Sequence, residues 1–183
     1  HRGASGHAPE HTFAAYDLAM RMGAEYLEID LLPTADNELV AIHDDRLDRT
    51  ARGPSEHCTG RVSSKTLEQL QHCDFGIWFN ERHPDKASAD YVGQKIPTLD
   101  AIFQRYGKHA NYYIEIKPNL ALQGSVEQAL LELIKTHGLY EGMVERRQVL
   151  VQSFVPTSLL TMWTLDPQVP LVQLMFAGSQ ALV

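Results

Sequence analysis

The sequence predicts an α/β fold built on a parallel sheet, and three observations support this prediction. Five short apolar runs, rich in Val, Ile, Leu and Tyr, have the length of strands. Helical patterns separate most of these runs. The runs are apolar almost throughout, as in a parallel sheet that is covered on both faces. The expected strands are residues 24–32, 39–44, 111–117, 149–154 and 170–175.

Four helices are expected between these strands, because each has a recognisable boundary residue. A Ser or Thr side chain can cap a helix start, glycine often follows a helix end, and proline suits a first turn. The expected helices run from Thr12 to Gly23, from Thr98 to Gly107, from Ser125 with Gln128 as a capping box to Gly138, and onward from Pro156.

Residues 46–97 read as a long insertion after the third strand, because Gly and Pro recur along them and leave room for one short helix from about Thr66. Insertions of this length usually serve a function or are mobile. Cys58 and Cys73 lie within the insertion without a second pair of cysteines, which matches neither a zinc signature nor a disulfide framework. We therefore expect both to be inert thiols.

The charge balance excludes some classes of partner. The chain of 183 residues carries 23 acidic against 16 basic side chains, a net charge of −7, with no run of Lys or Arg. This composition argues against binding to nucleic acid or to an anionic membrane surface. No apolar run approaches the ~20 residues of a transmembrane helix. A cytoplasmic location is slightly favoured, a periplasmic or secreted one stays open if a signal precedes His1, and the oligomeric state is left open.

Charged side chains gather on one face of the expected sheet. In a strand, alternate side chains share a face, so Glu28 and Asp30 point together, and so do Glu115 and Lys117. His43 ends the strand before the insertion. Three clustered carboxylates repel one another unless a cation lies between them, and oxygen ligands without a thiol select Mg²⁺ or Ca²⁺.

Basic residues accompany these carboxylates. Lys117 and Arg2 add positive charge that suits an anionic substrate, and an arginine followed by Gly3 can grip a phosphate with two N–H donors. Any phosphate must be held locally in this way, because the chain as a whole is acidic.

The order of motifs resembles one enzyme family. "HRGASGHAPEHT", "EIDLLPTADNELVAIHDDRLDRT", "TGRVSSKTLEQL", "IPTLD" and "YYIEIK" follow one another from residue 1 to about 118 as in the glycerophosphodiester phosphodiesterases, whose fold is a (β/α)₈ barrel. The resemblance implies that Glu28, Asp30 and Glu115 hold one divalent cation. It also implies that His1 and His43 are general acid and base, that Arg2 and Lys117 contact phosphate, and that residues 46–97 cover the active-site face. His11 stands where the family more often has Asn, a change expected to be tolerated.

The expected reaction is hydrolysis of a glycerophosphodiester to sn-glycerol 3-phosphate and an alcohol. Either histidine can be the base, and the headgroup is open. One alternative is a related phospholipase-like barrel that acts on lysophospholipid or sphingomyelin, or that stops at a cyclic phosphate. An exposed apolar rim near residues 75–79 would favour it. The other alternative is an inactive binding protein on the same fold.

The strand count predicts that the barrel is incomplete. A (β/α)₈ barrel takes ~250 residues, and the five runs with His1 as the end of a first strand make about six of eight units. We therefore expect a single, partial catalytic domain over residues 1–183, with a few apolar residues preceding His1 and two strand–helix units following Val183.

Overall fold

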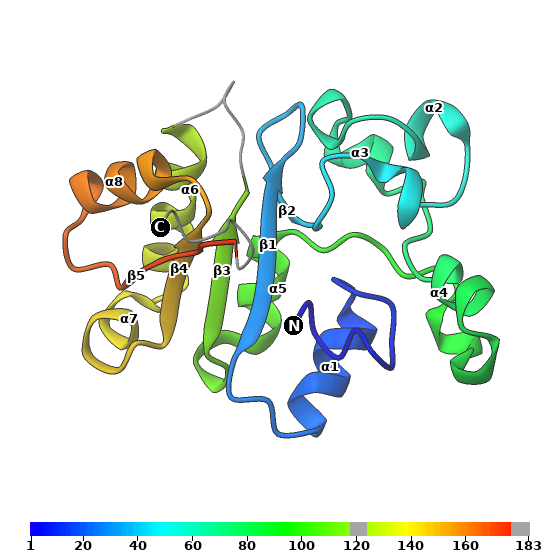
Figure 1. The fold of residues 1–183 in the computed structure, drawn as a ribbon, viewed down its shortest axis with the longest axis horizontal. Coiled ribbons are helices and arrows are strands. Elements are labelled where there is room, and N and C mark those ends of the chain that lie inside the picture. Colours follow the sequence, from blue (N-terminus) through cyan, green and yellow to red (C-terminus); the bar gives the residue numbers. More distant parts are fainter. Residues whose placement is uncertain (118–123, 177–183) are drawn as a thin grey trace, which may run out of the picture.

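A mixed sheet runs through the computed structural model, which describes residues 1–117 and 124–176. Its strand order is β2-β1-β3-β4-β5 (Figure 1). Strands β1, β3, β4 and β5 run parallel, whereas β2 pairs antiparallel with β1. The strands are β1 (Leu27–Pro33), β2 (Leu39–Ala41), β3 (Tyr112–Ile116), β4 (Val149–Ser153) and β5 (Leu171–Gln173).

The antiparallel pairing of β2 corrects the prediction of a third parallel strand at residues 39–44. A turn at Thr34–Glu38 joins β1 to β2, and it is far too short for the crossover of about a dozen residues that a parallel neighbour needs. The residues from His1 to Glu10 form turns, not the end of a strand. The described residues thus hold four parallel strands and one antiparallel strand instead of six parallel units, and the insertion follows the second observed strand.

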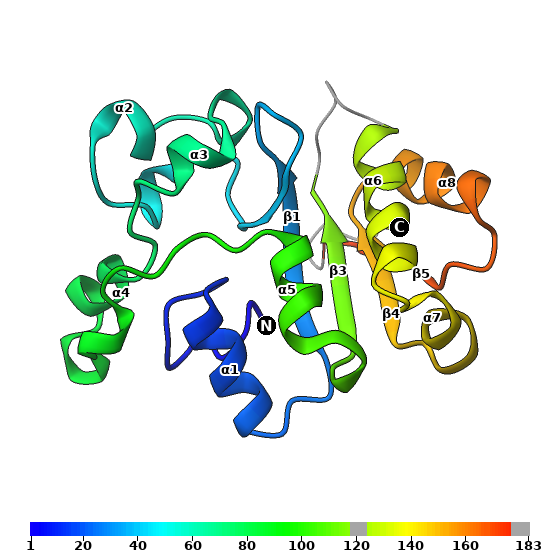
Figure 2. The same cartoon turned by 180° about the vertical axis from the view of Figure 1, so that it is seen from behind.

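Helices cover one face of the sheet, where α5 lies in front of β1 and α6 in front of β4 in the rear view (Figure 2). Leu27, Ile29 and Leu31 alternate along β1 toward this side and join the main core. Within the described ranges, no helix is long and apolar enough to cross a membrane. The larger helices are α1 (Phe13–Arg21), α5 (Leu99–Tyr106), α6 (Ser125–Thr136), α7 (Tyr140–Arg146) and α8 (Pro156–Leu165).

Most predicted helix boundaries are confirmed. Thr12 and Thr98 each accept a hydrogen bond from a first-turn backbone N–H of their helices, and Pro156 begins α8. The prediction of a capping box formed by Ser125 and Gln128 was wrong. Glu127 caps α6 instead by accepting the backbone N–H of Gly124, which precedes the helix.

The insertion folds around a second core on the opposite face of the sheet. Leu32 from β1, with Val40 and Ile42 from the β2 segment, packs against apolar side chains of residues 47–96. The insertion contains short helices at α2 (Ser55–Cys58), α3 (Leu67–Leu70) and α4 (Ile77–Arg82). Its position places it on the face of β1 that also carries Glu28 and Asp30.

Cys58 and Cys73 form a disulfide in this second core, so the expectation of two inert thiols was wrong. Their Cα atoms are 5.5 Å apart, a separation that a disulfide readily spans. The disulfide links Cys58 at the end of α2 to Cys73, three residues after the end of α3. It therefore joins these two parts of the insertion covalently.

Candidate active site

The first residues of the chain fold into a tight turn against β1 and α1. Arg2 and Gly3 both have positive φ angles. A Cβ atom on Gly3 would lie 2.8 Å from the backbone carbonyl carbon of Ala15, so only glycine fits at this position. The turn directs the backbone N–H of Arg2 to Glu28 Oε2, at 2.6 Å.

Three carboxylates converge on the face of the sheet opposite the main helices. The parallel register of β1 and β3 sets Asp30 beside Glu115, and Glu28 lies two residues before Asp30 on the same face. Glu28, Asp30 and Glu115 are all buried, and each offers one oxygen within 4.8 Å of the others'. The predicted grouping of these three side chains is therefore what the fold produces.

Lys117 and Arg2 lie beside the carboxylates. Lys117 Nζ is 3.0 Å from Asp30 Oδ1 and 2.9 Å from Glu115 Oε1. Arg2 Nε is 3.5 Å from Asp30 Oδ2. His1 is mostly exposed at the edge of the cluster, with Nε2 4.0 Å from Glu28 Oε2.

Burial and mutual repulsion give the carboxyl groups different pKa values. Burial, together with the negative charge of Asp30, raises the pKa of Glu28 to about 7, despite the N–H donated by Arg2. Burial also raises the pKa of Glu115 against the attraction of Lys117. For Asp30, burial acts in the same direction but is outweighed by His11 and Lys117, which hold its pKa well below the usual value.

His11, expected only as a tolerated replacement of Asn, lies in direct contact with the carboxylate cluster. It is buried, with Nε2 2.8 Å from Asp30 Oδ2 and Nδ1 2.7 Å from the hydroxyl of Tyr16. Burial lowers the pKa of His11, and an ionised Asp30 can only accept a hydrogen bond. The neutral ring therefore donates from Nε2 to Asp30 and accepts at Nδ1 from Tyr16.

His43 lies two residues after the end of β2, whereas His1 lies in the first turn of the chain, beside Glu28. The N–H of Ile42 donates to the carbonyl of Asp30 at 3.0 Å, which brings the chain past the carboxylate strand. The His43 side chain contacts Asp44, with Nδ1 2.6 Å from Oδ1. In the part of the chain that the structure describes, no hydrogen bond or ion pair joins His43 directly to Glu28, Asp30 or Glu115.

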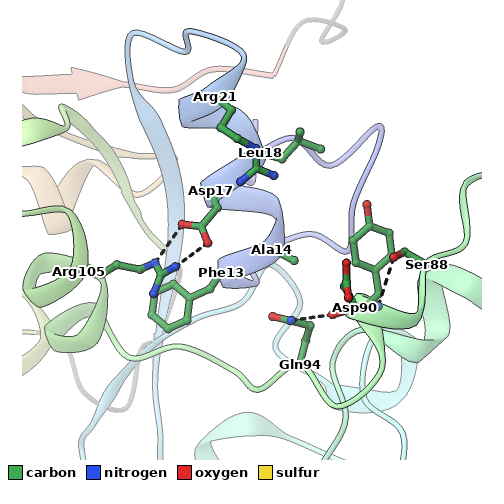
Figure 3. A pocket seen from close by; sticks show the side chains of 10 residues that line it. Phe13, Ala14, Asp17, Leu18, Arg21, Ser88, Asp90, Gln94 and Arg105 are labelled. Atoms are coloured by element: carbon green, nitrogen blue, oxygen red, sulfur yellow. Dashed lines mark hydrogen bonds and ion pairs between the residues drawn. The ribbon is translucent and has the colours of Figure 1, made fainter.

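A cavity of about 480 Å³ opens beside the carboxylates. The cavity is lined by the polar side chains of His1, Glu28, Glu115 and Gln152 and by the aromatic or apolar side chains of Tyr26, Tyr113, Phe154 and Leu174. A second cavity of about 530 Å³ lies between α1 and residues 88–94 (Figure 3). There Asp17 and Arg105 satisfy each other with two hydrogen bonds. Arg21 and Asp90 also line this cavity, so its acidic and basic side chains balance, whereas the charged groups of the first cavity include two converging carboxylates.

Comparisons with known proteins agree with the motif order. The profile of the Glycerophosphoryl diester phosphodiesterase family matches residues 1–182. A glycerophosphodiester phosphodiesterase of Bacillus subtilis (strain 168) is 43% identical over 181 residues, which are 99% of this chain and 60% of that protein. The chain thus spans about three fifths of the length of this relative.

Solved structures give the same result. A glycerophosphodiester phosphodiesterase from Agrobacterium tumefaciens C58 matches with a TM-score of 0.75 and 33% identity, over 93% of this chain and 63% of that one. An Oleispira antarctica phosphodiesterase in complex with the product sn-glycerol-3-phosphate matches with a TM-score of 0.75 and 30% identity, over 94% and 62%. The open sheet described above is part of a (β/α)₈ barrel, and the chain belongs to the glycerophosphoryl diester phosphodiesterase family.

Proposed function

We propose that the protein is a glycerophosphodiester phosphodiesterase that hydrolyses its substrate to sn-glycerol 3-phosphate and an alcohol with the help of one divalent cation. The observation that carries this proposal is the convergence of three buried carboxylates beside two cationic side chains, within the family's motif order. The named product of the Oleispira antarctica relative supports the same reaction class.

The carboxylates suit a hard divalent cation. Asp30 Oδ1 and Glu115 Oε1 are buried, and neither accepts a hydrogen bond of good geometry, although the Lys117 ammonium is close. Buried acceptor oxygens of this kind are uncommon unless an ion or a water completes them. Oxygen-only ligands select Mg²⁺ or Ca²⁺ over softer metals. Glu28, Asp30 and Glu115 would hold the ion, which would neutralise negative charge on the phosphate and lower the pKa of the attacking water.

The remaining residues divide the other tasks of hydrolysis. Water attacks phosphorus while a base removes its proton, the bond from phosphorus to the alcohol oxygen breaks, and an acid protonates the leaving alkoxide. We assign base and acid to His1 and His43. Arg2 and Lys117 carry positive charge beside the carboxylates and are held there by ion pairs, as needed to neutralise the non-bridging oxygens.

The aromatic and apolar residues that line the cavity favour a second candidate function, that of a related enzyme acting on lysophospholipid or sphingomyelin. Tyr26, Tyr113, Phe154 and Leu174 could contact an acyl chain. However, Phe75, Trp78 and Phe79 are buried in the insertion, so the exposed apolar rim that would favour this alternative is missing at residues 75–79.

One experiment separates the candidates. The protein is incubated with glycerophosphocholine and with lysophosphatidylcholine in the presence of Mg²⁺ or Ca²⁺, and the phosphorus products are followed by ³¹P NMR. We expect glycerol 3-phosphate from glycerophosphocholine at the higher rate. A cyclic phosphate as the main product, or a strong preference for the lipid, would favour the second candidate. Binding of glycerophosphocholine without turnover would make the protein a binding protein on this fold.

A further inference from the structure

Arg49, near the start of the insertion, joins two parts of the candidate site: Glu10, which lies beside Arg2, and Asp44, which lies beside His43. Its Nη1 and Nη2 donate to the two carboxylate oxygens of Glu10 at 2.9 and 2.7 Å. Its Nε donates to Asp44 Oδ2 at 2.6 Å. The planar guanidinium group therefore uses one edge for a bidentate pair and its Nε–H for a second carboxylate, a geometry that lysine cannot reproduce.

One branch of this network ends at His43. Asp44 accepts from Arg49 at Oδ2 and faces His43 Nδ1 with Oδ1 at 2.6 Å. Hydrogen bonds from Arg49 and His43 lower the pKa of Asp44 against the opposing effect of its partial burial. An ionised carboxylate accepts only, so the His43 ring donates from Nδ1–H to Asp44 and turns Nε2 away from this carboxylate, where it can serve in proton transfer.

The other branch ends at Arg2. Glu10 Oε1, which Arg49 Nη2 holds, is also 3.3 Å from Arg2 Nη1. The Glu10 side chain is largely buried between these two arginines. Since Arg2 in turn contacts Glu28 and Asp30, the position of the phosphate-binding arginine depends on a carboxylate that Arg49 fixes.

The insertion supplies the rigidity that this role needs. Arg49 lies in a short 3₁₀ turn, Leu47–Arg49, whose Leu47 is fully buried in the insertion core. The Arg49 guanidinium carbon also lies 5.8 Å from the centroid of the buried Trp78 ring, within the range of a cation–π contact. This contact adds a further restraint on the guanidinium beside its three hydrogen bonds to carboxylates.

We propose that Arg49 is a positioning residue that holds His43 in the Nδ1–H tautomer through Asp44 and orients Arg2 through Glu10. The insertion therefore aligns the acid–base histidine with the phosphate-binding arginine. The catalytic consequence rests on the proposed function, whereas the tautomer of His43 does not.

The test uses the purified protein labelled with ¹⁵N-histidine, and it compares Arg49→Gln with a matched control, Arg61→Gln. Arg61 lies in the same insertion and forms an exposed ion pair with Asp45, so its loss should leave the site unchanged. The tautomer is read from the ring nitrogen signals, with the His43 resonances assigned by their absence in His43→Gln. We expect the Nδ1–H tautomer in the parent protein and in Arg61→Gln, and a shift toward Nε2–H in Arg49→Gln.

Turnover of glycerophosphocholine is measured with the same variants. We expect Arg49→Gln to lower kcat by about tenfold or more. The same variant should raise KM, because Arg2 is held less firmly. Arg49→Lys should restore only part of the lost activity. Folding is checked by thermal unfolding. If Arg49→Gln does not fold, the tautomer shift is sought in Arg49→Lys.

The two measurements separate the failure of this inference from the failure of the proposed function. An Nε2–H tautomer in the parent protein, or an unchanged Nδ1–H tautomer in a folded Arg49 variant, overturns the positioning role. A tautomer shift in a protein that does not turn over glycerophosphodiesters upholds the positioning of His43 and rejects the proposed reaction.

Discussion

Nε2 of His11 lies 2.8 Å from Oδ2 of Asp30, and both side chains are buried. This contact fixes one carboxylate of the candidate metal centre through a residue ten positions from the chain start. The hydroxyl of Tyr16 holds the opposite ring nitrogen, so the ring cannot turn without losing two hydrogen bonds. His11 thus orients Asp30 from outside the carboxylate cluster.

Replacing His11 tests this role. His11→Leu removes the hydrogen-bond partner of the Tyr16 hydroxyl and one of the partners of Asp30, which we expect to lower the free energy of unfolding by about 1–3 kcal/mol. It should also weaken Mg²⁺ binding, measured by isothermal titration calorimetry, by about 10- to 100-fold. The matched control is His11→Asn, because Asn tolerates the left-handed backbone at this position, where φ is 51°, and can still donate to Asp30. Equal Mg²⁺ affinity in His11→Leu and the parent protein would contradict the role.

The dependence on a divalent cation gives a second prediction. Excess chelator should abolish turnover of glycerophosphocholine, and Mg²⁺ or Ca²⁺ should restore it, because three carboxylates converge on one point. Glu28→Ala and Asp30→Ala should fold but lack activity. Glu38 is an exposed carboxylate on the β1–β2 turn, so Glu38→Gln is the matched control and should retain activity. Full turnover in excess chelator would refute the metal requirement.

The alternation of side chains along β1 and β3 is the part of the site that sequence alone could predict. Because a strand repeats every two residues, Glu28 and Asp30 had to share a face, and a parallel neighbour then brings Glu115 alongside. The direction of β2 was missed, although the five residues from Thr34 to Glu38 contained the signal. A gap of that length permits a hairpin and excludes a parallel crossover.

Contacts between distant loops could not be predicted in this way. The bond of His11 to Asp30 depends on a left-handed turn in a polar segment, and the pair Cys58 and Cys73 depends on how the insertion closes. Neither leaves a periodic pattern in the sequence. The hydrogen bonds of Arg49 to Glu10 and Asp44 could not be predicted either. Ion pairs on the surface and hydrogen-bond networks in active sites use the same residue types, so the sequence does not distinguish them.

The two histidines give a third prediction. His1→Ala and His43→Ala should each lower kcat on glycerophosphocholine by ~10² or more, as expected for loss of a general acid or base, while Mg²⁺ binding persists. His109→Ala, an exposed histidine distant in sequence, is the control. A substrate with a nitrophenol leaving group needs no acid, so the variant that regains activity on it identifies the acid. Near-normal turnover of glycerophosphocholine by either variant would show that the replaced histidine is neither the general acid nor the general base.

The disulfide gives a fourth prediction. Cys58 and Cys73 are fifteen residues apart, and a loop of that size contributes about 3 kcal/mol of stability by restricting the unfolded chain. Reduction, or the double change Cys58→Ala with Cys73→Ala, should lower the thermal midpoint. Thiol titration of the unreduced, denatured protein should find no free thiol, and two free thiols would refute the bridge. A buried disulfide is typical of proteins that fold in oxidising compartments, which weighs against the slight preference for the cytoplasm.

The raised pKa of Glu28 gives a fifth prediction, for the metal-free protein. Burial, reinforced by Asp30, moves the pKa of this carboxyl from 4.5 to about 7, and that of Glu115 moves in the same direction. Between these values the folded protein binds more protons than the unfolded chain, so the contribution of Glu28 is present below pH 4.5 and is lost as the pH rises through 7. Asp30 acts oppositely, because its pKa is lowered from 3.8, but only in more acidic solution.

Metal-free protein should therefore unfold at a lower urea concentration at about pH 8 than at about pH 5. Glu28→Gln, which cannot ionise, should flatten this dependence, whereas the exposed-site control Glu38→Gln should keep it. A divalent cation needs ionised carboxylates, so its binding should release protons in weakly acidic solution and reverse the trend. Calorimetric titration in two buffers of different ionisation enthalpy measures that release. Metal binding without proton release near pH 6 would contradict the raised pKa of Glu28.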